Sequence, residues 1–554
     1  MNKYFAVLDD FPGRKSFALF LFIVSLAYLA LGCLRNFNTY DEGISVYCAS
    51  RILDGYVLYR DTWTIYPPGQ FYLLALVFKL FGTSLVVERL LSIIIFSLVA
   101  LCIYLLSTRL MPFKYSLFPW FFALMLLAHV PMMNGLAIVT ALLCSLLSCL
   151  LLTRFLFTQN KWMLLPAGLL IGFTALFRQD IGFYTFVSAS VVIICFAYVN
   201  LVRAHGAGLK KYTAGLSVFG ILSAGVMTIL VPAFIFLIIK KVDIKELVED
   251  LIILPGIVLP EFRVLPYPPP CPNPLYVLDG TLSAAKFLKN TLESIPYYIP
   301  AASIVTVIQF FLLLRGKCAF TPKEWLLSLL FLITIGLFNY ARGRPDIWHI
   351  NPVAILASIL LMYAFYSFTR NIFFAKNVLC RNLTICMVTA AVIYSAGVFF
   401  EITPRKFRSV HLVKLDIERA SGIKVPQDDA KSLTEAVQYI QENTAANEKI
   451  FVCNMRHDKI YTNDVMFYFM VERHSATKYY EFNPGLTTTL KIQKQIVADI
   501  IKSRTKYVIM SLKGYQKELN KSNESSGVTL LDTFLKEKYA PVKVLSCYVI
   551  LKEI

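Results

Sequence analysis

Two neighbouring acids, Asp41 and Glu42, follow the first long apolar run of the chain, at 17–34. The run is close to the length that crosses a bilayer, so both carboxylates lie near the membrane surface, where they are costly to bury. Ionisable groups at this depth generally face a cavity and mark a substrate or ion path. A carboxylate there can act as a general base. The alternative is that the two acids only cap the following helix.

Two further groups of charged residues occur in short turns between later apolar runs. The string LFRQDIG contains Arg178 and Asp180, and the string RGRPDIWHINP contains Arg342, Arg344, Asp346 and His349. Guanidinium groups bind phosphate in a fixed bidentate geometry, so both clusters suit a lipid-linked phosphate. The alternative is that Arg178 pairs with Asp180 and Arg344 pairs with Asp346 as structural ion pairs.

His349 could be a metal ligand or a proton carrier. No second His or acid lies at ligand spacing on the same helix, which favours a hydrogen-bonded structural histidine. Asp41, Glu42 and a distant residue could still meet around a divalent metal ion. The sequence gives no positive sign of a metal or of any other cofactor.

The composition places these residues in a polytopic membrane protein. The chain has 554 residues, of which 57% are hydrophobic and 16% are charged, and its mean hydropathy is +0.62. These values predict a mostly α-helical membrane protein rather than a globular one. About eleven apolar runs read as membrane crossings: 17–34, 85–107, 117–130, 136–153, 162–177, 181–199, 214–239, 299–314, 325–340, 352–368 and 383–400.

The charges between these runs predict the topology. Loops with Lys and Arg but few acids, such as those holding Arg14 and Arg109, alternate with loops that hold most of the acids. Because basic loops stay in the cytoplasm, the amino terminus is expected inside and Asp41 outside. The net charge of +19 mostly reflects these basic loops and is weak evidence for nucleic-acid binding.

The outer loops have structure of their own. In the first, at 35–86, the string YCASRILDGYVLYRDTW has amphipathic helical spacing, and about thirteen apolar residues after Gly69 predict an interfacial or re-entrant helix. Pro67 and Pro68 would break a helix before it, and the whole loop is expected to lie flat on the membrane. A second outer loop, at 240–291, contains VLPYPPPCPNPLY, which resists regular structure. It could cover a cavity or act as a stiff spacer.

The hydropathy falls after 400, which divides the chain into a membrane domain at 1–400 and a soluble outer domain at 401–554. Helical spacing at 430–443 and 490–504, with buried-strand strings KIFVC, KYVIMSL and VKVLSCYVIL, predicts a small α/β layer structure. Cys453 and Cys547 lie in two of these strings and could form a disulfide if their strands are neighbours.

The first outer loop resembles that of the GT-C glycosyltransferases. The resemblance rests on the acid pair, then ILDGYVLYRD ending at Asp61, then YPPG beginning at Tyr66, then FKLFG and Arg89. It is strongest for the bacterial relatives of protein O-mannosyltransferases and of the lipid A aminoarabinose transferase. The strings LFRQD and RPDIWHINP are similar to later outer-face motifs of this group.

The resemblance implies transfer of a sugar from a polyprenyl-phosphate donor to a glycolipid, glycan or protein on the periplasmic face of a bacterial inner membrane. It implies that Asp41 activates the acceptor and that Glu42 supports it. In the aminoarabinose transferase a Lys stands where this chain has Tyr66, so the donor phosphate is expected to contact other bases, namely Arg178, Arg342, Arg344 or Lys79. Supporting roles are expected for Asp61, Tyr66, Arg89, Asp180, Asp346 and His349. A single displacement would invert the anomeric carbon.

Two other functions fit a polytopic protein. A transporter or flippase for a lipid-linked or anionic solute would carry its charges in broken helices near the midplane and would have repeated halves. Here the charges lie at the ends of the runs, and the halves do not mirror each other. An interaction scaffold would need far fewer spans than eleven.

Overall fold

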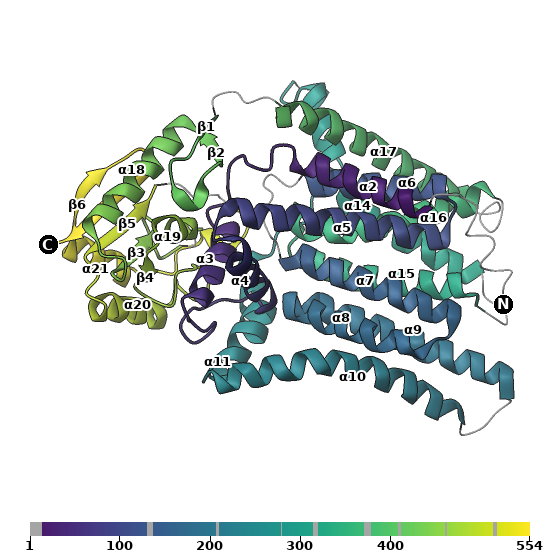
Figure 1. Cartoon of the computed structure of the whole chain (residues 1–554). Helices are drawn as coiled ribbons and strands as arrows, with labels where there is room; N and C mark the ends of the chain where they lie inside the picture. The colour runs from purple at the N-terminus through teal and green to yellow at the C-terminus, as the bar shows by residue number, and fades with distance from the viewer. Residues whose placement is uncertain are drawn as a thin grey trace.

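The computed structural model of the chain describes residues 14–129, 137–205, 210–278, 280–313, 320–370, 378–407, 412–459, 462–512 and 518–554. Long helices lie side by side through most of the molecule, and a smaller domain containing a β-sheet covers one end of them (Figure 1). The predicted class, a mostly α-helical polytopic protein with a small α/β domain, is confirmed.

Each predicted apolar run corresponds to one long helix. These helices are α2 (Arg14–Ala30), α5 (Leu85–Leu110), α6 (Phe113–His129), α7 (Ala137–Thr158), α8 (Leu164–Phe177), α9 (Gln179–His205), α10 (Lys210–Ile239), α14 (Ala284–Leu313), α15 (Pro322–Gly343), α16 (Ile347–Thr369) and α17 (Val378–Phe407). Three predicted run ends, Val130, Leu136 and Leu314, lie outside the described residues. Within the described part of the chain, seven helices are long and apolar enough to cross a membrane.

The first outer loop contains two short helices. The first, α3 (Asp41–Leu53), begins at the acid pair itself, and the second, α4 (Gly69–Phe81), is the predicted thirteen-residue apolar helix. Leu80 and Phe81 of α4 are largely exposed, as an interfacial helix requires. The first of these helices is not exposed on the surface. Most of α3 is buried, because it packs between α4 and a helix of the carboxyl-terminal domain, α19 (Val465–Val471).

The second outer loop is more ordered than its prolines suggest. It contains α11 (Ile244–Val248), the π-helix η2 (Glu249–Val258), α12 (Leu259–Arg263) and α13 (Leu275–Leu278), and α14 already begins at Ala284. The proline-dense stretch at 264–274 has no helix or strand, as expected. The string VLPYPPPCPNPLY is therefore irregular except for its last two residues, which begin α13.

The carboxyl-terminal domain contains a two-stranded and a five-stranded sheet. The first pairs β1 (Leu412–Lys414) with β2 (Lys424–Pro426), and the second has the order β4-β3-β5-β7-β6. Its strands are β3 (Lys449–Cys453), β4 (His474–Ser475), β5 (Tyr507–Ser511), β6 (Tyr539–Val544) and β7 (Tyr548–Glu553). Strand β3 is parallel to β4 and β5, whereas β7 is antiparallel to β5 and β6. The helices around them are α18 (Gln427–Asn443), α19, α20 (Leu490–Lys502) and α21 (Leu530–Lys538).

One prediction for this domain is wrong, and the disulfide left open from the sequence is not formed. The string VKVLSCYVIL is not one strand, because it turns at 545–547 and forms the hairpin of β6 and β7. Cys453 and Cys547 are free, buried thiols. Cys453 ends β3 and Cys547 precedes β7, and β5 lies between these two strands, so the cysteines are not neighbours across the sheet.

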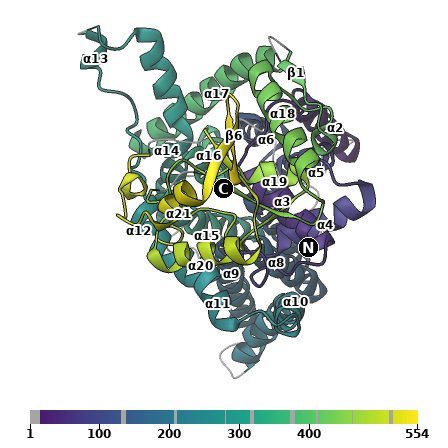
Figure 2. The same cartoon turned by 90° about the vertical axis from the view of Figure 1, so that its left-hand side faces the viewer.

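The carboxyl-terminal domain is docked on the first outer loop by backbone contacts. The amide of Met466 in α19 donates to the carbonyl of Thr39 (2.9 Å), and Lys424 in β2 exchanges backbone hydrogen bonds with Leu34 and Asn36 (both 2.8 Å). A Cβ added to Gly43 would lie 2.5 Å from the amide nitrogen of Met466, so α3 and α19 touch backbone to backbone there. In Figure 2 the domain faces the viewer, in front of the long helices.

Candidate functional site

Asn38 sets the position of Asp41 at the start of α3. Its side-chain oxygen accepts from the backbone amides of Tyr40 and Asp41 (2.9 Å each), and its amide nitrogen donates to the Asp41 carboxylate (3.4 Å). Both Asp41 and Glu42 lie in the first turn of the helix, where the dipole favours negative charge. Neither acid makes a side-chain capping hydrogen bond, so only the favourable place at the amino end of the helix remains of the capping alternative, and Asp41 stays partly exposed.

Glu42 is held in a buried ion pair. Its two oxygens accept from Nε and Nη2 of Arg89 on α5 (2.7 and 3.0 Å), and one also accepts from the amide of Asn38 (2.8 Å). Arg89 donates further to the carbonyls of Cys33 and Asn36. Both side chains are at most 1% exposed, so this pair fixes the link between α2 and α3 and leaves Glu42 out of reach of a substrate.

Charged groups from distant elements surround Asp41. Burial raises the pKa of the Asp41 carboxyl above its ordinary value, and the negative charge of Asp346 adds to this rise. The positive charges of Arg263 and His349, with the hydrogen bond from Asn38, oppose it. Arg263 ends α12, and Asp346 and His349 lie at the start of α16, so three segments far apart in sequence meet at Asp41.

The turn between α8 and α9 contributes Arg178 and Asp180. Nε and Nη2 of Arg178 donate to the two oxygens of Asp180 (3.2 and 2.7 Å). The guanidinium also lies over the ring of Tyr340 on α15, 5.1 Å from its centroid. Burial raises the pKa of Tyr66, the negative charges of Asp41 and Glu481 raise it further, and the positive charges of Arg263 and Arg178 oppose this. Tyr66 therefore lies close to both acidic and basic groups. Asp41 and the residues that surround it are called the cluster below; the surrounding residues are Asn38, Tyr66, Arg178, Asp180, Arg263, Tyr340, Arg344, Asp346, His349, Glu481 and Glu518.

The turn between α15 and α16 contributes Arg344, Asp346 and His349. Nε of Arg344 donates to Asp346 (2.8 Å), and its two terminal nitrogens bind the Glu518 carboxylate (3.0 and 2.6 Å). Asp346 also caps α16 by accepting from the amide of His349 (3.1 Å), and it pairs with His349 Nδ1 (2.6 Å). Burial would raise the pKa of Asp346, but His349 and Arg344 hold it below its ordinary value.

Both ion pairs that the sequence left as an alternative to phosphate binding therefore exist. The side chains of Arg178 and Arg344 remain 18% and 19% exposed. Nη1 of Arg178 lies outside the pair with Asp180, whereas all three guanidinium nitrogens of Arg344 donate to protein acceptors.

Several residues of the cluster were not predicted from the sequence. They are Arg263, Tyr340, Glu481 and Glu518, together with Asn38. Glu481 is completely buried, and its Oε1 accepts from Asn483 (2.9 Å), whereas Oε2 has no hydrogen-bond partner among the described residues. Burial raises the pKa of Glu481 to about 8. The only signals in the sequence were an acid within the aromatic string YYEF and an arginine just before the proline-dense stretch.

Besides Glu42 and Arg89 in their buried ion pair, three predicted residues lie outside the cluster. Asp61 pairs with Arg60 (2.7 Å) and lines a separate pocket. Lys79 and Arg342 are exposed, and neither forms an ion pair within the described part of the chain. Among the described residues, no three His, Cys, Asp or Glu side chains are arranged to hold a metal ion.

Comparison of the whole structure with solved structures finds the fold of ArnT. The crystal structure of ArnT from Cupriavidus metallidurans bound to undecaprenyl phosphate superposes with a TM-score of 0.54, at 12% identity, over 98% of both chains. The apo form of that protein gives a TM-score of 0.52 at the same identity, over 98% of this chain and 99% of that one. The chain has the GT-C fold.

The resemblance to GT-C glycosyltransferases expected from the sequence is thus confirmed at the level of the fold. The arabinosyltransferase EmbB from Mycobacterium smegmatis is also similar, with a TM-score of 0.43 and 13% identity over 73% of this chain and 42% of that chain. At the level of sequence, no protein-family model and no curated protein matches this GT-C chain. With its long apolar helices, the GT-C fold makes the chain a multi-pass membrane protein.

Proposed function

We propose that the chain is a membrane glycosyltransferase that moves a sugar from a polyprenyl-phosphate donor to an acceptor. The observation that carries the proposal is the cluster itself. The partly exposed residue Asp41 feels the positive charge of Arg263 directly. Arg178 and Asp41 both act on Tyr66, and Arg344 pairs with Asp346, whose charge also reaches Asp41. Transfer from a sugar phosphate needs a base for the incoming nucleophile and cations for the departing phosphate. The GT-C fold, and the undecaprenyl phosphate bound to ArnT, support the same chemistry.

Asp41 takes the role of general base in this proposal. Burial raises its pKa, which brings a carboxylate closer to the pH at which it must accept a proton from a hydroxyl or amine. Glu42 cannot serve as a second nucleophile, because Arg89 and Asn38 occupy its oxygens in the interior. One displacement by the acceptor, with inversion at the anomeric carbon, follows from this arrangement.

The phosphate contacts are assigned to the bases of the cluster. Arg178 and Arg263 are the first candidates. Arg178 has one terminal nitrogen outside its pair with Asp180, and among the described residues the guanidinium of Arg263 makes a single long bond, to Asn483 (3.4 Å). Arg344 is held by Asp346 and Glu518, so it supplies charge and shapes the turn. Lys79 and Arg342 are assigned no contact with the donor.

The proposed compartment follows the charges of the loops. The amino terminus faces the cytoplasm, and the cluster and carboxyl-terminal domain face the periplasm of a bacterial inner membrane. The acceptor is a glycolipid, a glycan or a protein that reaches this face.

Asp41→Asn tests the proposal. Without a base, transfer from undecaprenyl-phosphate-linked sugars to membrane acceptors should fall by about 100-fold or more. The assay follows radiolabelled sugar in membranes that hold equal amounts of folded protein. Asp61→Asn is the matched control, because it changes an acid of the same outer loop that lies outside the cluster. Full transfer by Asp41→Asn would overturn the role of Asp41.

A further inference from the structure

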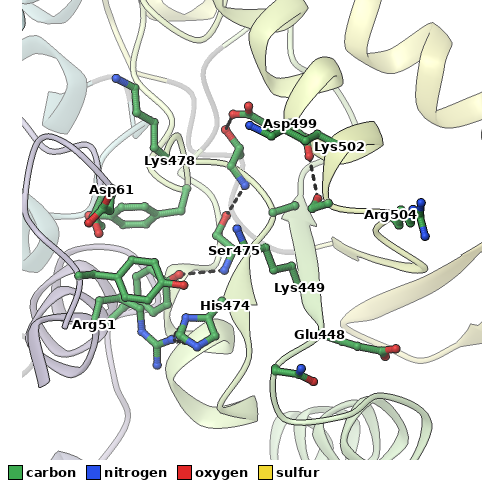
Figure 3. Close-up of a pocket in the computed structure, with 18 of the residues that line it drawn as sticks. Arg51, Asp61, Glu448, Lys449, His474, Ser475, Lys478, Asp499, Lys502 and Arg504 are labelled. Carbon is green, nitrogen blue, oxygen red and sulfur yellow. Dashed lines mark hydrogen bonds between the residues drawn. The ribbon is translucent and has the colours of Figure 1, made fainter. Parts of the chain in front are cut away.

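A second polar pocket lies between the first outer loop and the carboxyl-terminal domain. Its volume is about 800 Å³, which is within the range of small-molecule sites. The end of α3 and the segment after it form one wall, and the starts of β3 and β4 with the end of α20 form the other. Lys449 and His474 are register partners in the sheet, so both strand starts face it. Figure 3 shows Lys449 between Arg51 and His474 on one side and Lys502 on the other.

The pocket is separate from the Asp41 cluster. Arg51 lies ten residues after Asp41 on α3, which at 1.5 Å per residue is about 15 Å along the helix. Between them the helix buries Tyr47 and Cys48 against Tyr480, whose hydroxyl lies 2.6 Å from the Cys48 sulfur. A ligand in this pocket therefore does not touch the proposed catalytic carboxylate.

The charges of the pocket favour an anion. Seven Lys or Arg side chains line it, against three Asp or Glu side chains. Two of its acids are already neutralised, Asp61 by Arg60 and Glu448 by Lys506 (2.7 Å each). Lys449, Lys502 and Arg504 form no ion pair within the described part of the chain. Cationic side chains without a carboxylate partner are ready to bind phosphate or carboxylate groups.

Arg51 adds a buried donor to this surface. Its side chain is 3% exposed, and its Nε has no hydrogen-bond partner among the described residues. Its terminal nitrogens contact the ring of His474 and pair with Asp54 (2.8 Å). The pKa of His474 is lowered to about 4 by burial and then by the charge of Arg51, so this histidine is neutral and does not add a competing positive charge. A buried guanidinium with a free N–H is an incomplete hydrogen-bond site.

The pocket also offers a flat aromatic surface and neutral polar groups. The rings of Tyr56 and His474 stack with centroids 5.0 Å apart and planes 19° apart. Ser475, Asn447 and Gln495 line the pocket beside them. An aromatic face next to hydroxyl and amide groups suits the apolar face and the hydroxyls of a sugar ring.

We propose that this pocket binds an anionic sugar, with Arg51, Lys449 and Lys502 meeting its phosphate or carboxylate and Tyr56 meeting its ring. The inference does not depend on the proposed transfer reaction. It assigns to the carboxyl-terminal domain a carbohydrate site of its own, completed by the first outer loop.

The test is calorimetric binding to the purified full-length protein in detergent at low salt. Trigalacturonate and glucose 6-phosphate are the carboxylate and phosphate probes, and maltotriose is the neutral control. We expect at least one anionic probe to bind and maltotriose not to bind. Lys449→Glu and Lys502→Glu should each weaken binding by about tenfold, the loss expected for one charged hydrogen bond. Which probe binds identifies the anion.

The matched control is Lys494→Glu, the same change on an exposed residue of α20 that does not line the pocket. It should keep the affinity within about twofold. Lys502→Gln should lose less affinity than Lys502→Glu, which separates a charge effect from misfolding. Asp41→Asn should leave this binding unchanged. A failure of the proposed transfer reaction can therefore be distinguished from a failure of the pocket proposal. Equal binding of maltotriose, no binding of either anion, or equal effects of Lys494→Glu and Lys502→Glu would overturn the proposal.

Discussion

At the scale of single residues, the cluster contains three carboxyl groups whose charges affect one another, those of Asp41, Asp346 and Glu481. The negative charge of Asp346 raises the pKa of Asp41, and the negative charge of Asp41 raises the pKa of Glu481, whereas the positive charge of Arg263 lowers both. Asp346 is held ionised by His349 and Arg344, whereas burial raises the pKa of Glu481 to about 8. Asp346 and Glu481 therefore differ in charge: Asp346 adds a negative charge beside Asp41, and Glu481 holds a proton.

Glu481 makes stability depend on pH. Because its pKa rises from 4.5 to about 8 in the folded protein, the native state holds a proton that the unfolded chain releases. Unfolding free energy contributed by this group therefore falls as pH rises from 4.5 to 8. Glu481→Gln should be more stable than the wild type at pH 8, by about 1–3 kcal/mol, and should lose this advantage near pH 4.5.

The measurement is the thermal unfolding midpoint of both proteins across this pH range. Glu537→Gln on α21 is the control, since it removes an exposed carboxylate. A Glu481→Gln midpoint that runs parallel to the wild type at every pH would contradict the assignment of a bound proton.

At the scale of elements, the contact between α3 and α19 positions Asp41. Gly43 lies two residues after Asp41, and a side chain there would meet the backbone of Met466, which cannot move aside as a side chain can. Gly43→Ala should therefore push the carboxyl-terminal domain away from α3, with a loss of about 1–3 kcal/mol of stability and reduced sugar transfer.

Limited proteolysis of the carboxyl-terminal domain and the transfer assay measure this effect. Gly220→Ala is the matched control, because Gly220 lies within α10 with open space where its Cβ would be. Both Gly→Ala changes raise the helix propensity by the same amount. A difference in stability or transfer between the two variants therefore reports the contact of α3 with α19. Equal behaviour of the two variants would show that the backbone contact does not position the site.

The arrangement of helices and strands also explains which site residues could be predicted from the sequence. The apolar runs and the charges at their ends are local features, so Asp41, Arg178 and Arg344 stood out from hydropathy alone. Arg263 and Glu481 could not be found in this way, because they reach the cluster only when α12 and the segment after β4 fold over the first outer loop. The buried position of α3 was missed for the same reason, since its cover comes from residues more than 400 positions later.

At the scale of the whole molecule, the ionised groups gather where the long helices meet the carboxyl-terminal domain. A transporter would instead place its binding charges in broken helices near the middle of the bilayer. The turns that hold Arg178 and Arg344 lie at the ends of α8 and α15, and the domain contributes Glu481 and Glu518 to the same place. This distribution favours chemistry at one membrane face over passage through the bilayer.

The account as a whole predicts where a polyprenyl phosphate binds. The most direct measurement is a structure of the full-length protein with undecaprenyl phosphate. We expect its phosphate within hydrogen-bonding distance of Arg178 or Arg263 and beside Asp41, with its lipid tail along the apolar helices. A phosphate bound away from these side chains, such as in the pocket of about 610 Å³ that Arg35 and Arg405 line, would contradict the central claim.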